Sequence, residues 1–180
     1  QSRDEDDRED TEGDFASAWI DHGVAPSSGG YEYAVVMGAT PERMAALAQA
    51  LAGDEAPWEV LRQDGAAHIV RDRPTGTLAL VLLQPGEIAP ELPVLRVDRP
   101  CLVMLEPEGD GWWLSVSDAD LNLEDHVSVP RELQLTLRGR WRLEAAPEEM
   151  SLADLGEAGT TVVVTCHDGF GFTARLVPAG

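Results

Sequence analysis

The sequence of 180 residues contains no lysine, only two cysteines and no long hydrophobic run. Two cysteines cannot hold together a disulfide-rich scaffold, and no apolar stretch reaches the ~18 residues that a membrane helix needs. The amino terminus has neither the basic nor the apolar region of a secretory signal. The CxxC, HExxH, Walker, GxGxxG and GxSxG motifs are also absent, as is any internal repeat. No motif therefore indicates a metal, nucleotide or nucleophilic-serine enzyme.

Acidic residues dominate the charge of the chain. Thirty-three Asp and Glu stand against 13 Arg, which gives a formal net charge of −20. Nucleic acid and anionic lipid both repel such a chain, so we expect neither as a partner. Eight of the acids lie within the first 14 residues, where like charges repel and we expect a solvated loop. With 43% hydrophobic residues, a chain of this length can bury ~70% of its extended-chain surface when it folds.

One helix is predicted, and it begins after Thr40. The Thr40 hydroxyl can cap the first turn, Pro41 suits the first helical position, and Glu42 interacts favourably with the helix dipole. Gly53 predicts the end of the helix. Apolar residues follow at helical spacing on one face: Met44, Leu47, Ala48 and Leu51.

Strands are predicted for most of the remaining chain. Before the helix, residues 15–22 and 31–37 alternate or are rich in aromatic and β-branched side chains. Turn residues bound the later segments, and three turns indicate hairpins: Asp64-Gly65, residues 108–111 and residues 167–169. The later strands are expected at 58–63, 67–70, 77–83, 101–106, 112–117, 132–137, 140–144, 161–166 and 172–177.

These patterns predict an all-β protein with one short helix, built from antiparallel β-sandwiches. In residues 132–137, Leu133 and Leu135 share one face with Leu137, and burial of three leucines contributes roughly 5 to 8 kcal/mol before entropy. Three prolines between residues 85 and 93 predict a domain boundary in this part of the chain.

A metal site is weakly indicated near residue 120. An EF-hand calcium loop also needs Gly at its sixth position and Glu at its twelfth, where this chain has Leu123 and Val129. We therefore favour an acidic β-loop and assign no metal ligand. The residues that begin like a calcium loop are Asp118, Asp120, Asn122 and Glu124.

Both cysteines lie in predicted core strands. A disulfide between Cys101 and Cys166 closes a long loop and adds ~4 kcal/mol in the chain-entropy model. Two separate buried thiols fit equally well, because free cysteine is among the most buried residue types. The sequence leaves both alternatives open.

The acid–base candidates lie near the amino terminus. A histidine and a tyrosine can exchange a proton with a substrate when the phenol pKa falls from ~10. We favour a structural role for this group, in which two tyrosines share one strand face and a turn ends the preceding strand. The group comprises Asp21, His22, Tyr31 and Tyr33.

The other three histidines give no site either. His68 lies in an apolar strand and is predicted to be a core histidine with satisfied hydrogen bonds. His126 and His167 lie in predicted loops, without partners at the sequence spacing of metal ligands.

Seven short segments lie in order over nearly the whole chain: residues 18–23, 31–33, 39–44, 59–70, 84–85, 99–104 and 115–123. Together they resemble the C-terminal end of chondroitin sulfate ABC lyases. These enzymes belong to polysaccharide lyase family 8, with hyaluronate, chondroitin AC and xanthan lyases. One departure is Ala119, where the family tends to have proline in a turn.

The resemblance implies that this chain is part of a larger enzyme. Family members have a helical toroid, a central super-sandwich and a smaller C-terminal sandwich. Residues 1–92 then correspond to the end of the super-sandwich, with 1–13 as an acidic loop, and residues 93–180 to the C-terminal sandwich. The family's catalytic Asn, His, Tyr, Arg and Glu lie upstream, so no catalytic, cofactor-binding or metal residue is assigned here, and no cofactor is expected.

The implied function is that of a non-catalytic region of a lyase that cleaves chondroitin or dermatan sulfate, or hyaluronan, by β-elimination. The implied partners are the remainder of the parent lyase and, through it, the polysaccharide, in an extracellular or periplasmic location. The alternative is a stand-alone carbohydrate-binding or adhesion sandwich. Such modules present exposed aromatic side chains, for which Trp112 and Trp113 are the candidates; because they are adjacent on a strand, at most one faces the core.

Overall fold

The computed structural model describes residues 17, 19–27, 30–53, 55–154 and 159–179, in two compact units with a boundary between Ala39 and Thr40. Each unit is considered separately. The described residues of the first unit form no helix or strand, so the strands predicted at 15–22 and 31–37 are wrong for the part of them that is described. A lone strand is unstable without a neighbour to accept its backbone hydrogen bonds, and these residues of the unit supply none.

The described residues of the second unit form one helix and fourteen strands. Among the described residues, no helix is long and apolar enough to cross a membrane. The elements are α1 (Pro41–Ala52), β1 (Trp58–Gln63), β2 (Ala67–Asp72), β3 (Leu78–Leu82), β4 (Gly86–Glu87), β5 (Val94–Val97), β6 (Cys101–Glu108), β7 (Gly111–Ser117), β8 (Leu123–Glu124), β9 (Val127–Ser128), β10 (Arg131–Leu137), β11 (Trp141–Ala145), β12 (Met150–Asp154), β13 (Thr160–Cys166) and β14 (Gly171–Pro178).

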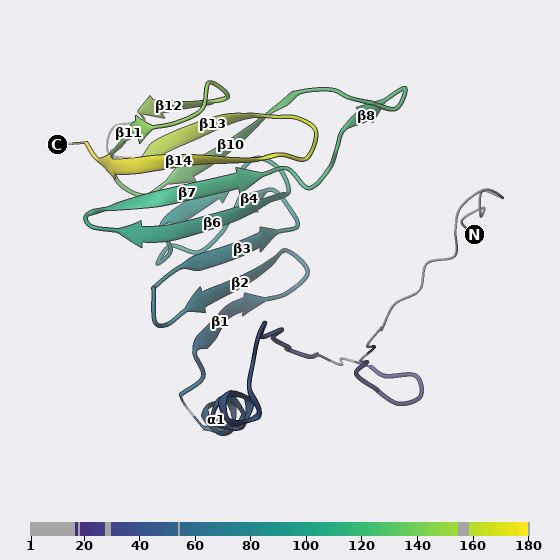
Figure 1. The fold of residues 1–180 in the computed structure, drawn as a ribbon. Coiled ribbons are helices and arrows are strands. Elements are labelled where there is room, and N and C mark those ends of the chain that lie inside the picture. Colours follow the sequence, from purple (N-terminus) through teal and green to yellow (C-terminus); the bar gives the residue numbers. More distant parts are fainter. Residues whose placement is uncertain (1–16, 18, 28–29, 54, 155–158, 180) are drawn as a thin grey trace, which may run out of the picture. The chain divides into compact units, whose positions relative to one another are not determined.

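The strands form an antiparallel sandwich. The larger sheet has the order β1-β2-β3-β6-β7-β14-β11 and the smaller sheet β12-β13-β10-β5-β4, while β8 and β9 form a separate hairpin (Figure 1). Buried residues of both sheets make one core, among them Leu80 and Leu105 from the larger sheet and Leu133 and Val162 from the smaller. The predicted fold class, antiparallel β-sandwich with one short helix, is confirmed.

The proline-rich segment leads from the larger sheet to the smaller sheet of the same sandwich. Strand β3 pairs with β6, with Leu80 opposite Val103, so the larger sheet continues across the boundary predicted between residues 92 and 93. The prolines lie where β4 and β5 join the smaller sheet. Strands β1 to β3 therefore share one sheet with β6, β7 and β14. The boundary between the two compact units lies earlier, between Ala39 and Thr40. The correspondence of residues 1–92 to a central super-sandwich stays a prediction.

Helix α1 forms where the sequence predicts it. The Thr40 hydroxyl accepts a hydrogen bond from the Arg43 amide at 3.3 Å, and the Gly53 amide donates to the Ala50 carbonyl at the other end. No residue of the helix is buried in the described unit. Its apolar stripe, which includes Met44 and Leu51, therefore remains exposed.

Two of the three predicted hairpin turns are confirmed. Asp64 holds the β1–β2 turn, and the Arg62 guanidinium together with two backbone amides lowers the Asp64 pKa to about 2. Glu108 lies opposite Gly111 in the β6–β7 hairpin. The third prediction is wrong: residues 167–169 connect β13 and β14, which belong to different sheets. Strand β14 pairs with β7 and β11 instead.

Candidate functional site

On one face of the larger sheet, two neighbouring rows of side chains cross six strands and contain no Asp, Glu or Arg. In β2, β3 and β6, the residue that lies between the two rows (Ile69, Leu80 or Val103) is buried in the core. Because side chains alternate along a strand, the two rows point out of the sandwich. These residues, called the uncharged face below, are Gln63, His68, Val81, Leu102, Ser117 and Gly171, then Val60, Val70, Ala79, Met104, Ser115 and Thr173.

The centre of the uncharged face is apolar. Val81, Leu102 and Met104 are 40, 41 and 44% exposed, and they come from the neighbouring strands β3 and β6. The outward row beyond Met104 carries charge again, with Glu106 opposite Trp113 and Trp113 opposite Arg175. A quarter of the chain is charged, so an outward surface without charge over two whole rows differs from the rest of the protein.

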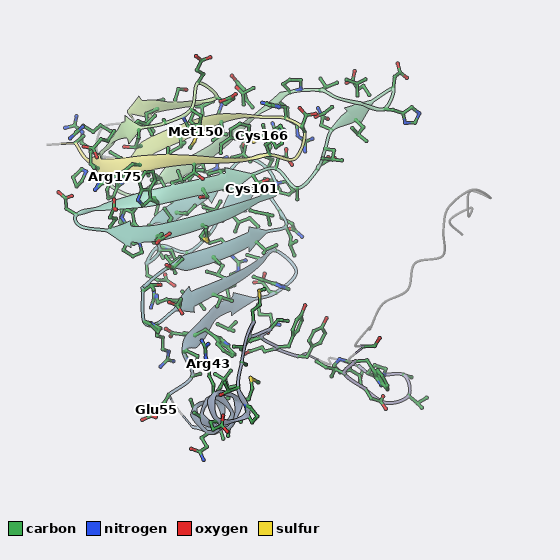
Figure 2. The ribbon with its side chains drawn as sticks, viewed as in Figure 1. Arg43, Glu55, Cys101, Met150, Cys166 and Arg175 are labelled. Atoms are coloured by element: carbon green, nitrogen blue, oxygen red, sulfur yellow. The ribbon has the colours of Figure 1, made fainter. Side chains whose placement is uncertain are left out.

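The two adjacent tryptophans do not form a bare aromatic platform. Trp112 packs against the core, and Trp113 is half-buried on the opposite face. Arg175, opposite Trp113, is held by Glu108 at 2.7 Å and Glu144 at 2.8 Å (Figure 2). The sugar-binding alternative depends on an exposed tryptophan at this position, which the described residues do not provide.

An arginine occupies the centre of the predicted acidic loop. Arg131 Nε lies 2.6 Å from Asp118 Oδ2, a second guanidinium nitrogen lies 3.1 Å from Asp120, and the third lies 3.5 Å from Asn122 Oδ1. Three of the four calcium candidates therefore surround a guanidinium, and Glu124 is exposed in β8. No cluster of three or more His, Cys, Asp and Glu in the described part of the chain could hold a metal ion.

The charge balance of this loop keeps Asp118 ionised. Burial raises the Asp118 pKa, but the Arg131 guanidinium and the Asp120 amide outweigh burial and hold the pKa below its ordinary value. The carboxylate is only 3% exposed, so its partners replace water. The arrangement is a buried ion pair that shapes the loop, in agreement with the predicted acidic β-loop.

Cys101 and Cys166 are free thiols, so the structure favours the second of the two alternatives that the sequence left open. Cys101 is the first residue of β6 and Cys166 is the last residue of β13, and both are buried (Figure 2). Burial, helped by the nearby Cys166, raises the Cys101 pKa to about 12. Burial also raises the pKa of Cys166. Thiols protonated in this way are poor nucleophiles.

Three ring side chains of the first unit, those of His22, Tyr31 and Tyr33, lie close to one another. The ring centroids of His22 and Tyr31 are 5.4 Å apart, and those of Tyr31 and Tyr33 are 6.1 Å apart. Asp21 Oδ1 accepts a hydrogen bond from the Gly23 amide and stabilises the turn. All of these side chains are exposed, and the strand face and strand end on which their structural role was predicted are absent from the described residues.

Two histidines differ from their predicted surroundings. His68 is exposed rather than buried, because Ala67 and Ile69 beside it point into the core. His167 lies between two acids, with Nδ1 3.0 Å from Asp168 and Nε2 3.8 Å from Glu149. The hydrogen bond with Asp168 raises the pKa of His167.

Comparison with known proteins identifies the region. Residues 59–125 match the sequence model of the polysaccharide lyase family 8, C-terminal beta-sandwich domain. The chain belongs to polysaccharide lyase family 8, in its C-terminal β-region. The matched residues run across the boundary predicted at residue 92, as the continuous larger sheet does.

Two long lyases of this family align with almost the entire chain. The chain is 31% identical to the chondroitin sulfate ABC endolyase of Proteus vulgaris over 95% of its own length, and 30% identical to a chondroitin sulfate ABC exolyase of Bacteroides thetaiotaomicron over 97%. It spans only 17% of the first relative and 19% of the second. The family resemblance is confirmed, and the chain corresponds to a small fraction of each relative.

Solved structures of family members share the fold. The chondroitin AC lyase of Streptomyces coelicolor A3, solved in complex with chondroitin sulphate, superposes with a TM-score of 0.60 at 19% identity, over 79% of this chain and 17% of that chain. A xanthan lyase of Paenibacillus superposes with a TM-score of 0.58 at 14% identity, over 76% of this chain and 12% of that one. These two structures show the fold alone, and the sequence matches make this β-sandwich the C-terminal β-sandwich region of a chondroitin-lyase-like polysaccharide lyase.

The sequence contained a signal for the uncharged face that the strand predictions did not use. Residues 78–83 and 101–105 are almost uninterrupted apolar runs, whereas a strand with one solvated face alternates apolar and polar residues. Such runs are typical of strands covered on both faces.

Proposed function

We propose that this chain is the non-catalytic C-terminal β-region of a longer lyase that cleaves uronic-acid-containing glycosaminoglycans by β-elimination. The observation that carries the proposal is the alignment of nearly the whole chain with less than a fifth of two chondroitin sulfate ABC lyases. Chondroitin and dermatan sulfate are the proposed substrates of the whole enzyme, with hyaluronan as a further candidate. The proposed location is extracellular or periplasmic, because such polymers lie outside the cytoplasm.

The chemistry of β-elimination explains why the reaction is placed elsewhere in the enzyme. The uronate carboxylate must be neutralised, a base must take the proton from C5, and an acid must protonate the departing O4. In this chain, the side chains of Arg131 and Arg175 are both engaged by carboxylates. The two tyrosines stack side by side in a unit that is separate from both of these arginines.

The charge of the chain supports a role away from the substrate cleft. A sulfated polysaccharide is a polyanion, and a surface with a formal net charge of −20 repels it. The proposed work of this region is mechanical: it covers and stabilises the remainder of the enzyme. The proposed partners are therefore the other domains of the lyase.

The test compares the purified 180-residue chain with the longer lyase that contains it. Each is incubated with chondroitin sulfate, and unsaturated uronate is followed by its ultraviolet absorbance. We expect product from the longer lyase and none from the 180-residue chain, which should also fail to retain the polysaccharide in a binding assay. Product release by the 180-residue chain alone would contradict the proposal. Tight polysaccharide binding by that chain would instead favour a carbohydrate-binding module.

A further inference from the structure

Strand β3 and residues 101–105 of β6 are apolar on both faces. In β3, Leu78, Leu80 and Leu82 point into the core, while Ala79 and Val81 point outward. In β6, the outward residues Leu102 and Met104 alternate with buried ones in the same way. Strands with two apolar faces are found where a sheet is covered on both sides. One side is covered by the smaller sheet, and the other is the uncharged face.

We infer that the uncharged face is the surface through which this region docks onto the remainder of the same lyase polypeptide. The inference rests on the proposed function and names the surface that makes the contact. An interface has an apolar centre and a polar rim. Here Val81, Leu102 and Met104 form the centre, and the adjoining row with Glu106, Trp113 and Arg175 forms a rim on one side.

The chemistry of the face excludes a sulfated polysaccharide as its occupant. Sulfate and carboxylate groups are bound by arginine or lysine, through charge-assisted hydrogen bonds. The uncharged face contains neither. On the adjoining row, Arg175 is already held by Glu108 and Glu144.

The net charge argues against a second copy of the chain. Two copies that meet through this face bring together two bodies of charge −20, and that repulsion opposes association. A domain of the same polypeptide is covalently linked to this region, so it is present at a high effective concentration. The relatives provide ample polypeptide for this purpose, because the chain spans only 17 and 19% of their lengths.

The test introduces a charge at the centre of the face. Leu102→Glu is compared with Ser151→Glu, which places the same charge at an exposed position of β12 in the smaller sheet. Both are made in the longer lyase and in the 180-residue chain, and thermal unfolding of each is measured. Burial of an unpaired charge is strongly destabilising. We expect Leu102→Glu to lower the melting temperature of the longer lyase by at least ~5 °C and at least twice as much as it lowers that of the 180-residue chain.

The controls separate the possible outcomes. Ser151→Glu should change both melting temperatures equally, by no more than ~1–2 °C. Equal effects of Leu102→Glu in the longer lyase and in the 180-residue chain would overturn the inference. Dimerisation of the 180-residue chain in sedimentation experiments, abolished by Leu102→Glu, would also overturn it in favour of a second copy. In either case the proposed function would still stand if the longer lyase cleaved chondroitin sulfate and the 180-residue chain did not.

Discussion

Arg131 and Asp118 form the shortest ion pair of the acidic loop, with 2.6 Å between Nε and Oδ2. Asp118 directly follows β7 and Arg131 is the first residue of β10, so the pair closes the excursion that contains β8 and β9. Figure 1 shows that this excursion extends away from the two sheets. The guanidinium occupies the position where the sequence had indicated a bound cation, and it supplies the positive charge from within the chain.

Removal of the guanidinium should destabilise the second unit. In Arg131→Ala, the Asp118 carboxylate stays buried without its partner, and such a loss costs about 3 kcal/mol. The measurement is urea unfolding followed by tryptophan fluorescence. Arg138→Ala is the control, because Arg138 is exposed and its removal should change the free energy of unfolding by no more than ~0.5 kcal/mol. An Arg131→Ala cost as small as this control would contradict the structural role of the pair.

The same pair predicts that the cost of Arg131→Ala depends on pH. In the wild-type chain the folded-state pKa of Asp118 is lowered, so its contribution is present above the unfolded-state pKa and is lost as pH falls through the folded-state value. In Arg131→Ala, burial is opposed only by the Asp120 amide and the charge of Arg99, so the folded-state pKa of Asp118 rises relative to the wild type and acidification should diminish the destabilisation. Unfolding of both proteins between pH 3 and pH 7 would show the difference between them shrinking toward low pH. A constant difference would contradict this account.

The local features of the fold were predictable from local signals. Thr40 and Gly53 bound α1 because a cap and a stop are properties of a few adjacent residues. The alternation of Leu133 and Leu135 with polar neighbours predicted the buried face of β10 for the same reason. Strands β4, β8 and β9 were not predicted, because two-residue strands have no period to recognise, and the short strands β5 and β12 were not predicted either.

Features that depend on distant residues were not predictable. The ion pair of His167 with Glu149 joins the end of one strand to the start of another, and no local spacing indicates it. The exposure of His68 follows from its register between Ala67 and Ile69, but its apolar surroundings suggested burial. Strand β14 pairs with β7 rather than with the preceding strand β13. In each case the result depends on how the whole sandwich packs, which no local pattern of residues encodes.

His167 should titrate above the ordinary histidine range. Its hydrogen bond with Asp168 raises the pKa, so the interaction contributes to stability at pH values below the unfolded-state pKa and is lost as pH rises through the folded-state value. NMR titration of the imidazole proton signals measures the pKa directly. Asp168→Asn should lower the midpoint, and Glu149→Gln should lower it less, because that carboxylate is 3.8 Å away. An unchanged midpoint in Asp168→Asn would disprove the assigned cause.

The two cysteines should resist alkylation in the folded protein. With a pKa of about 12 for Cys101, only about one thiol in ten thousand is ionised at pH 8, and burial restricts access further. Iodoacetamide labelling followed by mass spectrometry should show modification of both residues in urea and of neither in buffer over the same time. Rapid labelling of Cys101 in buffer would mean that this end of the sandwich opens or that the thiol is exposed.

Gly111 should not tolerate a side chain, for a steric reason alone. It begins β7 opposite Glu108, and a Cβ at this position would overlap the backbone carbonyl of Leu176 in β14. Because a backbone carbonyl of a paired strand cannot move without breaking the ladder, Gly111→Ala should cost about 3 kcal/mol. Gly65→Ala is the matched control: its Cβ would meet nothing within 4 Å, and its free energy of unfolding should stay within ~0.5 kcal/mol of the wild type. Equal unfolding midpoints for the two variants would show that β7 and β14 do not approach as closely as the structure has them.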